Sequence, residues 1–172
     1  LGGIYFAVEN RHLLPKNTAY VVCPNHSSYI DIVLLYRTIP EYFVFMGKKE
    51  IEKVPLFGNF FKMGMDISVD RRSNTGSHKA FLRACNEIDR GNNVIIFPEA
   101  TIPDCAPKMI TFKNGAFKLA IEKQVPIVPV TYTSNWKLMQ GSKLFKGKAG
   151  PGFTKAIIHH PISTTGMSEK DL

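Results

Sequence analysis

Two residues able to do acid–base chemistry, His26 and Asp31, lie five positions apart in segment 25–31, which reads Asn-His-Ser-Ser-Tyr-Ile-Asp. On one regular helix this spacing would separate the two side chains by about 140°, so they could hardly touch. If His26 instead precedes a helix that starts at Ser27 or Ser28, Asp31 lies in the first turns and can reach the imidazole. A carboxylate that orients a histidine is the base half of a catalytic triad.

A structural interpretation of the same residues is a capping box, with Ser28 as the cap and Asp31 three residues later. The two interpretations are compatible. A serine nucleophile at Ser27 is less well supported, because the chain has no Gly-x-Ser-x-Gly sequence and adjacent residues seldom pair as base and nucleophile. A zinc site built on Cys23 and His26 lacks a second pair of ligands at a suitable spacing, so no metal is expected.

The elements that must position this pair can be predicted from the flanking sequence. Residues 19–23 are apolar and are followed by Pro24, which predicts a buried strand. Residues 32–36 suit the buried side of a helix. The histidine and the aspartate therefore lie where a strand passes into a helix, a place where loops expose reactive groups on a rigid scaffold.

The rest of the chain alternates between the two kinds of element. We expect strands at 42–46, 67–69, 93–97, 126–132 and 155–159, helices at 48–53, 75–90 and 115–123, and a mobile basic loop or hairpin at 134–152. This alternation predicts an α/β fold, with a mostly parallel or mixed central sheet and helices on both faces. Functional residues then belong at the strand ends, where His26, Arg71 and Glu99 fall.

Length and composition limit the function further. The 172 residues predict a single domain over 1–172, and the net charge of +8 indicates a polyanionic partner such as nucleic acid, an anionic membrane, a phosphorylated substrate or an acidic carrier protein. Three widely spaced cysteines give no disulfide framework and favour a reducing compartment. No apolar run approaches the ~20 residues of a membrane span. The chain begins with Leu1 and not with Met, so we expect a piece of a longer protein, in which residues 1–8 are the tail of an upstream hydrophobic helix.

An apolar, aromatic stretch covers residues 54–63. One interpretation is a core segment with a turn, which fits Leu56 and Phe60 best. The other is an exposed apolar surface or groove that contacts an acyl chain or a bilayer, formed by Leu56, Phe57, Phe60 and Phe61.

Four blocks occur in a fixed order along the chain: Asn25-His26-x4-Asp31, Val69-Asp70-Arg71, Phe97-Pro98-Glu99-Ala100-Thr101, and the segment 125–130, Val-Pro-Ile-Val-Pro-Val. In this order they resemble the blocks of the glycerolipid acyltransferases, specifically the 1-acylglycerol-3-phosphate (lysophosphatidate) acyltransferase family of phospholipid biosynthesis. The resemblance covers about residues 19–133.

The resemblance implies transfer of a fatty acyl group from a thioester to the 2-hydroxyl of a lysophospholipid. His26 would act as general base, since imidazole titrates near working pH, and Asp31 would fix its tautomer. Arg71 would hold the acceptor's phosphate and Glu99 its glycerol hydroxyl. Asn25, Ala100 and Thr101 complete the expected substrate-binding set, with the oxyanion donors expected among the backbone amides near Ala100.

One block departs from the family pattern, which usually reads Glu-Gly-Thr-Arg. This chain has Glu99-Ala100-Thr101-Ile102. Alanine restricts the backbone here only if φ is positive at Ala100. Isoleucine at position 102 removes a cation, which bears on how the acceptor's phosphate is held.

The expected partners are acyl-CoA or acyl carrier protein, a lysophospholipid acceptor and an anionic membrane surface, with no cofactor and no nucleic acid. The expected location is the cytoplasmic face of the cell membrane, either peripheral or held by a segment absent from this chain. The alternative from another class is a non-catalytic basic module that binds anionic lipid or nucleic acid, suggested by the net charge and by the loop at 134–152.

Overall fold

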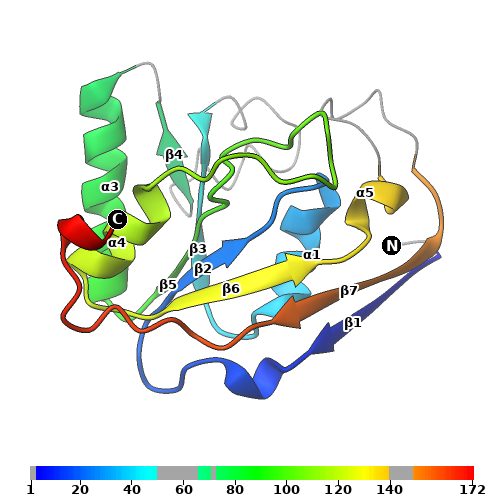
Figure 1. The fold of residues 1–172 in the computed structure, drawn as a ribbon, viewed down its shortest axis with the longest axis horizontal. Helices are drawn as coiled ribbons and strands as arrows, with labels where there is room; N and C mark the ends of the chain where they lie inside the picture. The colour runs from blue at the N-terminus through cyan, green and yellow to red at the C-terminus, as the bar shows by residue number, and fades with distance from the viewer. Residues whose placement is uncertain (1–2, 50–65, 71–72, 140–148) are drawn as a thin grey trace.

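The computed structural model describes residues 3–49, 66–70, 73–139 and 149–172, and within them the chain forms one seven-stranded mixed sheet (Figure 1). The strands are arranged in the order β1-β7-β6-β2-β5-β3-β4. All neighbouring strands are parallel except β6 and β7, which are antiparallel. Their bounds are β1 (Ile4–Glu9), β2 (Val21–Pro24), β3 (Phe43–Lys48), β4 (Ile67–Val69), β5 (Asn93–Ile95), β6 (Ile127–Tyr132) and β7 (Gly152–Ile158).

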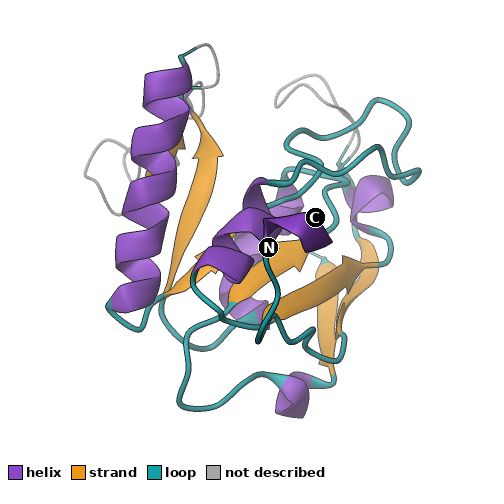
Figure 2. Ribbon diagram, turned by 60° about the vertical axis from the view of Figure 1, so that its left-hand side comes forward, coloured by secondary structure: helices purple, strands orange, loops and turns teal. Residues whose placement is uncertain are grey.

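Helices cover both faces of this sheet, as the sequence predicts. The described helices are α1 (Ile30–Thr38), α3 (Asn74–Asp89), α4 (Gly115–Glu122) and α5 (Asn135–Leu138), with short 3-10 turns η1 (Arg11–Leu13) and η3 (Glu169–Asp171). The long helix α3 runs beside the β4 edge of the sheet (Figure 2). None of the described helices is long and apolar enough to cross a membrane.

The central strands are buried on both faces by the helices that cover the sheet. Because adjacent side chains of a strand point to opposite faces, they enter two different hydrophobic clusters. In β2, Val22 packs in the cluster that contains Leu34 of α1, whereas Val21 packs in the cluster that contains Leu119 of α4. Strands buried on both sides read as continuous apolar runs, which is why residues 19–23 and 93–97 could be recognised from the sequence.

The first residues of the described chain are a strand rather than the tail of a helix, so that expectation was wrong. β1 pairs with β7 along its whole length, from Ile4 opposite Gly152 to Glu9 opposite Ile157. Ile4, Phe6 and Val8 pack against the α1-side core while Tyr5 is 73% exposed, a period of two that is typical of a strand.

Three other local predictions needed correction. Lys48 belongs to β3 and not to a charged helix, and residues 50–53 of that expected helix lie outside the described residues. Within 134–152, expected as a basic loop or hairpin, helix α5 was not predicted, whereas the antiparallel bridge between Met139 and Ala149 is consistent with a hairpin. Strand β5 ends at Ile95, two residues earlier than predicted.

The carboxyl ends of β2, β3, β5 and β6 meet at one edge of the sheet because these strands are parallel. The amino end of β7 reaches the same edge because β7 runs the other way. Residues far apart in the sequence are thereby brought together just beyond this edge.

Candidate active site

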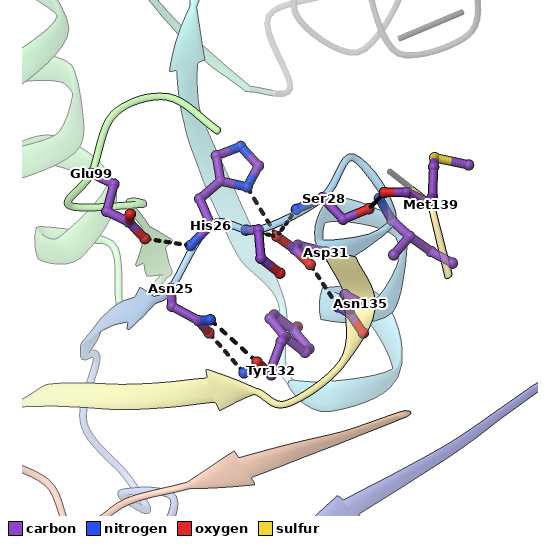
Figure 3. Close-up of polar contacts among 10 residues, drawn as sticks. Asn25, His26, Ser28, Asp31, Glu99, Tyr132, Asn135 and Met139 are labelled. Carbon is purple, nitrogen blue, oxygen red and sulfur yellow. Dashed lines mark hydrogen bonds and ion pairs between the residues drawn. The ribbon is translucent and has the colours of Figure 1, made fainter. Parts of the chain in front are cut away.

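His26 and Asp31 form a hydrogen-bonded pair at the turn between β2 and α1 (Figure 3). His26 Nδ1 lies 3.0 Å from Asp31 Oδ2, and the two side chains are 11% and 0% exposed. The helix begins at Ile30, later than the expected Ser27 or Ser28, but Asp31 still lies in its first turn. The contact expected for a histidine that precedes the helix is therefore confirmed.

The carboxylate of Asp31 also accepts hydrogen bonds from the backbone of the turn. The amides of Ser27 and Ser28 donate to Asp31 Oδ2 at 2.7 and 2.9 Å. The bond from Ser28 corresponds to the carboxylate half of a capping box, but the other half is not formed: the cap of α1 is Tyr29, and the hydroxyl of Ser28 accepts from the amide of Ile30 and not from that of Asp31. One carboxylate therefore both closes the turn and binds the histidine, without a complete capping box.

The imidazole ring of His26 is held on its face as well as at Nδ1. It stacks on the ring of Phe97, with 3.9 Å between centroids and 15° between planes. Because Nδ1 points to a carboxylate, Nδ1 carries the proton in the neutral ring and Nε2 is left as the basic nitrogen. The second ring nitrogen points away from Asp31 (Figure 3).

His26 lines a pocket between the start of α1, the end of β3 and the loop after β5. The pocket contains about 550 Å³ of empty space, including the part open to solvent. Its walls are mainly apolar, and in the described part of the chain Lys48 is the only lysine or arginine that lines it. The lining residues are His26, Tyr29, Ile32, Phe45, Met46, Gly47, Lys48, Phe97, Ala100, Thr101 and Ile102.

Lys48 was missed as a site residue in the sequence because it was assigned to a short charged helix at 48–53. The available signal was its place directly after the predicted strand 42–46, at the end where functional residues gather. Ile102, which departs from the family pattern, is a wall of the same pocket and is 8% exposed.

Glu99 lies beside His26, but its carboxylate binds backbone. The amide of His26 donates to Glu99 Oε1 at 2.8 Å, and the amide of Ile110 donates to Oε2 at 3.2 Å. Glu99 is 2% exposed. Both oxygens therefore hold the loops around the site, and a contact with the acceptor's glycerol stays a prediction.

Asn25 acts as an extension of the sheet. Its Oδ1 accepts from the amide of Tyr132 at 2.7 Å, and its Nδ2 donates to the carbonyl of Tyr132 at 3.2 Å (Figure 3). The side chain thus makes the two hydrogen bonds to β6 that the backbone of a strand residue would make, just beyond the point where the pairing of β2 with β6 ends. A direct role for Asn25 in substrate binding stays a prediction.

The backbone at Ala100 has φ of +63°, so this position does adopt the left-handed conformation that favours glycine. The amide of Ala100 donates to the carbonyl of Phe97 at 3.0 Å, closing a tight turn. That amide is therefore already used within the chain. Thr101 is exposed and lines the pocket.

Arg71 and the aromatic stretch with Leu56, Phe57, Phe60 and Phe61 lie outside the described residues. Their expected roles stay predictions. Ser27 is 4% exposed, and its hydroxyl has no hydrogen-bond partner within the described chain, so it is not paired with His26 as a nucleophile would be. Among the described residues no group of histidine, cysteine and carboxylate side chains could hold a metal ion.

Two buried residues that the sequence did not reveal complete the surroundings of Asp31. Asn135 of α5 donates through Nδ2 to Asp31 Oδ1 at 2.6 Å, and Thr154 of β7 donates to Asn135 Oδ1 at 2.6 Å. Asn135 is separated from Asp31 by 104 positions. No local pattern could have linked it to the site.

The structure is an α/β sheet with a partly exposed histidine paired to a buried aspartate beyond the carboxyl ends of its strands. Comparison with known proteins places this arrangement in a family. The acyltransferase family model matches residues 5–133, and the chain therefore belongs to the acyltransferase family. The resemblance drawn from the four sequence blocks is confirmed at this level.

The names of individual relatives specify the acyl acceptor as well as the family. The chain is 29% identical over 174 residues to 1-acyl-sn-glycerol-3-phosphate acyltransferase alpha of Mus musculus, covering 100% of this chain and 60% of that protein. It is 27% identical to the Haemophilus influenzae 1-acyl-sn-glycerol-3-phosphate acyltransferase, covering 97% and 69%. The chain thus spans only about 60% of the length of several relatives it matches.

A solved structure matches the fold. The crystal structure of the 1-acyl-sn-glycerophosphate acyltransferase PlsC from Thermotoga maritima superposes with a TM-score of 0.75 at 27% identity, covering 96% of this chain and 64% of that one. The predicted fold class, an α/β acyltransferase-like sheet, is confirmed.

Proposed function

We propose that this chain is the catalytic domain of an enzyme that moves a fatty acyl group from a thioester to the 2-hydroxyl of lysophosphatidate or a related lysolipid. The observation that carries the proposal is the His26–Asp31 pair, 3.0 Å apart, at the wall of a largely apolar pocket. The names of the relatives indicate the same acceptor class. The donor is acyl-CoA or acyl carrier protein.

In this mechanism His26 Nε2 takes the proton of the acceptor hydroxyl as that oxygen attacks the thioester carbonyl carbon. The carbon–sulfur bond then breaks, and the proton passes from His26 to the leaving thiolate. Asp31 stabilises the imidazolium that forms and keeps Nδ1 as the protonated nitrogen. No covalent acyl-enzyme is required.

The chemistry of the pocket suits both halves of a lysolipid. Ile32, Phe45 and Met46 offer an apolar wall for hydrocarbon, whereas Lys48 offers a cation for a phosphate. Because Ile102 replaces the family's arginine on this wall, we propose that Lys48 joins Arg71 in holding the acceptor's phosphate.

The direct test is thiol release from acyl-CoA and from acyl carrier protein, with lysophosphatidate present or absent. His26→Ala should abolish acceptor-dependent thiol release in a folded protein. Asp31→Asn should lower turnover by up to about 10⁴-fold, as loss of a triad carboxylate can. His12→Ala, at an exposed histidine remote from the pocket, is the matched control. Near-normal turnover in folded His26→Ala protein would refute the mechanism.

The alternative is a non-catalytic module that binds anionic lipid or nucleic acid through its positive charge. It predicts lipid or nucleic-acid binding that is unchanged in His26→Ala, with no thiol release by the wild type against any donor. An active wild type with an inactive His26→Ala variant excludes it.

We further propose that the enzyme works on an anionic membrane surface, at the cytoplasmic face of the cell membrane. The expected contact at 54–63 lies outside the described residues, but a second apolar stretch supports the proposal. Met109, Ile110 and Phe112 are 58%, 38% and 41% exposed, in the loop after β5. The amide of Ile110 holds this loop to Glu99, next to the site.

Lysines flank this stretch at positions 108 and 113, so apolar insertion and attraction to anionic headgroups would act together. In vesicle flotation, Met109→Asp combined with Phe112→Asp should weaken binding to anionic vesicles. Leu82→Asp, at a comparably exposed leucine of α3, is the control and should bind as the wild type does. Equal binding by all three proteins would exclude this loop as the membrane contact.

A further inference from the structure

The carboxylate of Asp31 is held from two directions by different parts of the chain. Oδ2 faces His26 and the amides of the β2–α1 turn, whereas Oδ1 accepts a hydrogen bond from Asn135, 104 positions later. Asn135 in turn accepts from the hydroxyl of Thr154. Asp31, Asn135 and Thr154 are all 0% exposed.

The direction of each hydrogen bond follows from the chemistry of the groups. The Oδ1 atom of an asparagine can only accept, so the hydroxyl of Thr154 must be the donor. The amide NH₂ of Asn135 must then face Asp31, whose carboxylate accepts. The carboxylate of Asp31, which can only accept, thus sets the orientation of the Asn135 amide, and Thr154 holds that orientation by donating to the amide oxygen on the other side.

We infer that Asn135 and Thr154 are positioning residues for His26, acting as a buried relay through Asp31. With donors on both oxygens, the carboxylate cannot rotate about its Cβ–Cγ bond without breaking a hydrogen bond. Its Oδ2 is thus kept in line with His26 Nδ1. If Asn135 is lost, Oδ1 becomes a buried acceptor without this donor, and the bonds to Oδ2 alone oppose rotation of the carboxylate.

Through this relay β7, the strand antiparallel to β6, contributes to the positioning of His26. Asn135 follows β6, and Thr154 enters from the amino end of β7, so the order β7-β6-β2 is what brings both to the turn after β2. The hydroxyl of Ser28 reinforces this connection by donating to the carbonyl of Met139, just after α5 (Figure 3).

The inference rests on the proposed acyl transfer for its kinetic readout, and the test uses a matched pair at position 154. Thr154→Ser keeps the hydroxyl and loses a methyl group, whereas Thr154→Val keeps the shape and loses the hydroxyl. The relay predicts nearly unchanged kcat for Thr154→Ser. It predicts a loss of about tenfold for Thr154→Val and Asn135→Ala, with KM for both substrates unchanged. A packing role predicts the reverse order, because only the serine variant leaves a cavity.

A second readout does not depend on activity. In the full chain, the proton on His26 Nδ1 should give a strongly downfield NMR signal in the wild type and Thr154→Ser. The signal should weaken or shift upfield in folded Thr154→Val and Asn135→Ala. Thermal melts establish which variants fold. If either Thr154→Val or Asn135→Ala does not fold, the other variant carries the test.

Wild-type kcat and an unchanged Nδ1 signal in folded Asn135→Ala would overturn the relay, as would equal losses in Thr154→Ser and Thr154→Val. If the wild-type protein shows no acyl transfer, the proposed function fails. The NMR comparison still decides whether Asn135 and Thr154 position His26.

Discussion

At the scale of single residues, the site depends on how a buried carboxylate is surrounded. A carboxylate removed from water is strongly destabilised unless its lone pairs are matched by donors. Asp31 accepts from His26, from two backbone amides and from Asn135, with donors on both oxygens. The same bonds that make its burial tolerable also fix its direction.

Ala100 holds a left-handed backbone conformation that an L-residue with a Cβ adopts at a cost of about 1 kcal/mol. Ala100→Gly should therefore raise the free energy of unfolding by up to about 1 kcal/mol, less the extra entropy of glycine in the unfolded chain. Urea denaturation measures this difference. Ala116→Gly, inside helix α4, is the control and should destabilise the protein by about 1 kcal/mol or more. A loss of stability in Ala100→Gly would contradict the expectation.

Lys48 and Lys49 are neighbours in the sequence with different surroundings. Lys48 lines the pocket, whereas Lys49 pairs with Asp70 at 3.4 Å on the surface. Lys48→Met should raise the KM for lysophosphatidate by about tenfold or more, because a charge-assisted bond is worth about 1.5–3 kcal/mol. The KM for the acyl donor should change little.

Steady-state kinetics with each substrate varied in turn separate these two effects. Lys49→Met serves as the control and should leave both KM values near those of the wild type. If Lys48→Met instead raises the donor KM alone, the cation serves the donor and the assignment of the acceptor's phosphate is wrong.

At the scale of elements, the important unit is the passage from β2 into α1. Pro24 ends β2, and Asn25 continues the pairing with β6 through its side chain for one more residue. The backbone is thereby free to turn, while Asp31 ties the turn to the first residues of the helix. The stacking of Phe97 on His26 adds a contact from the loop after β5.

Loss of the side chain at Asn25 should destabilise the protein because it leaves two backbone groups of Tyr132 without their partner. Asn25→Ala should lower the free energy of unfolding by about 2–3 kcal/mol. Chemical denaturation followed by circular dichroism is the measurement. The control Asn114→Ala, at an exposed asparagine that makes no capping bond, should change stability by less than about 0.5 kcal/mol. A similar effect of the two substitutions would show that Asn25 does not extend the sheet.

At the scale of the whole molecule, the sheet is covered on both sides, and its deepest side chains are cut off from solvent. Cys23, next to the last residue of β2, is also buried, with 8% of its surface exposed. Burial raises the pKa of its thiol to about 12, while Cys105 is exposed. A thiol with so high a pKa carries almost no thiolate near pH 8, and the thiolate is the reactive form.

A thiol reagent at pH 8 should therefore modify Cys105 rapidly in the native protein and Cys23 only after unfolding. The raised pKa also makes stability depend on pH. The contribution from the neutral thiol is fully present below the unfolded pKa, near 8.5, and is lost as pH rises toward 12. Mass spectrometry of modified peptides measures the reaction at each site. Rapid labelling of Cys23 in folded Cys105→Ser protein would show that the core opens locally.

Much of the fold and part of the site follow from the sequence alone. Hydrophobic runs and helical spacing predicted β2, α1, β4, α3, α4 and β6 close to their observed bounds. The reason is that the apolar residues of a helix or strand recur along the sequence with the period that turns them towards the core. The contact of His26 with Asp31 was predicted for a histidine that precedes the helix, because the chain between the two residues is then short enough for local geometry to bring them together.

The tertiary structure decided what the other site residues do. Lys48 reaches the pocket, Glu99 the backbone of His26, Asn135 the carboxylate of Asp31, and Thr154 the side chain of Asn135. All four contacts depend on the order of the strands, and that order depends on contacts between distant residues. A pattern of residue types does not specify which strand lies beside which, since every buried strand has a similar apolar sequence. The strand order β7-β6-β2, with α5 following β6 and α1 following β2, places Thr154 beside Asn135 and Asn135 beside Asp31.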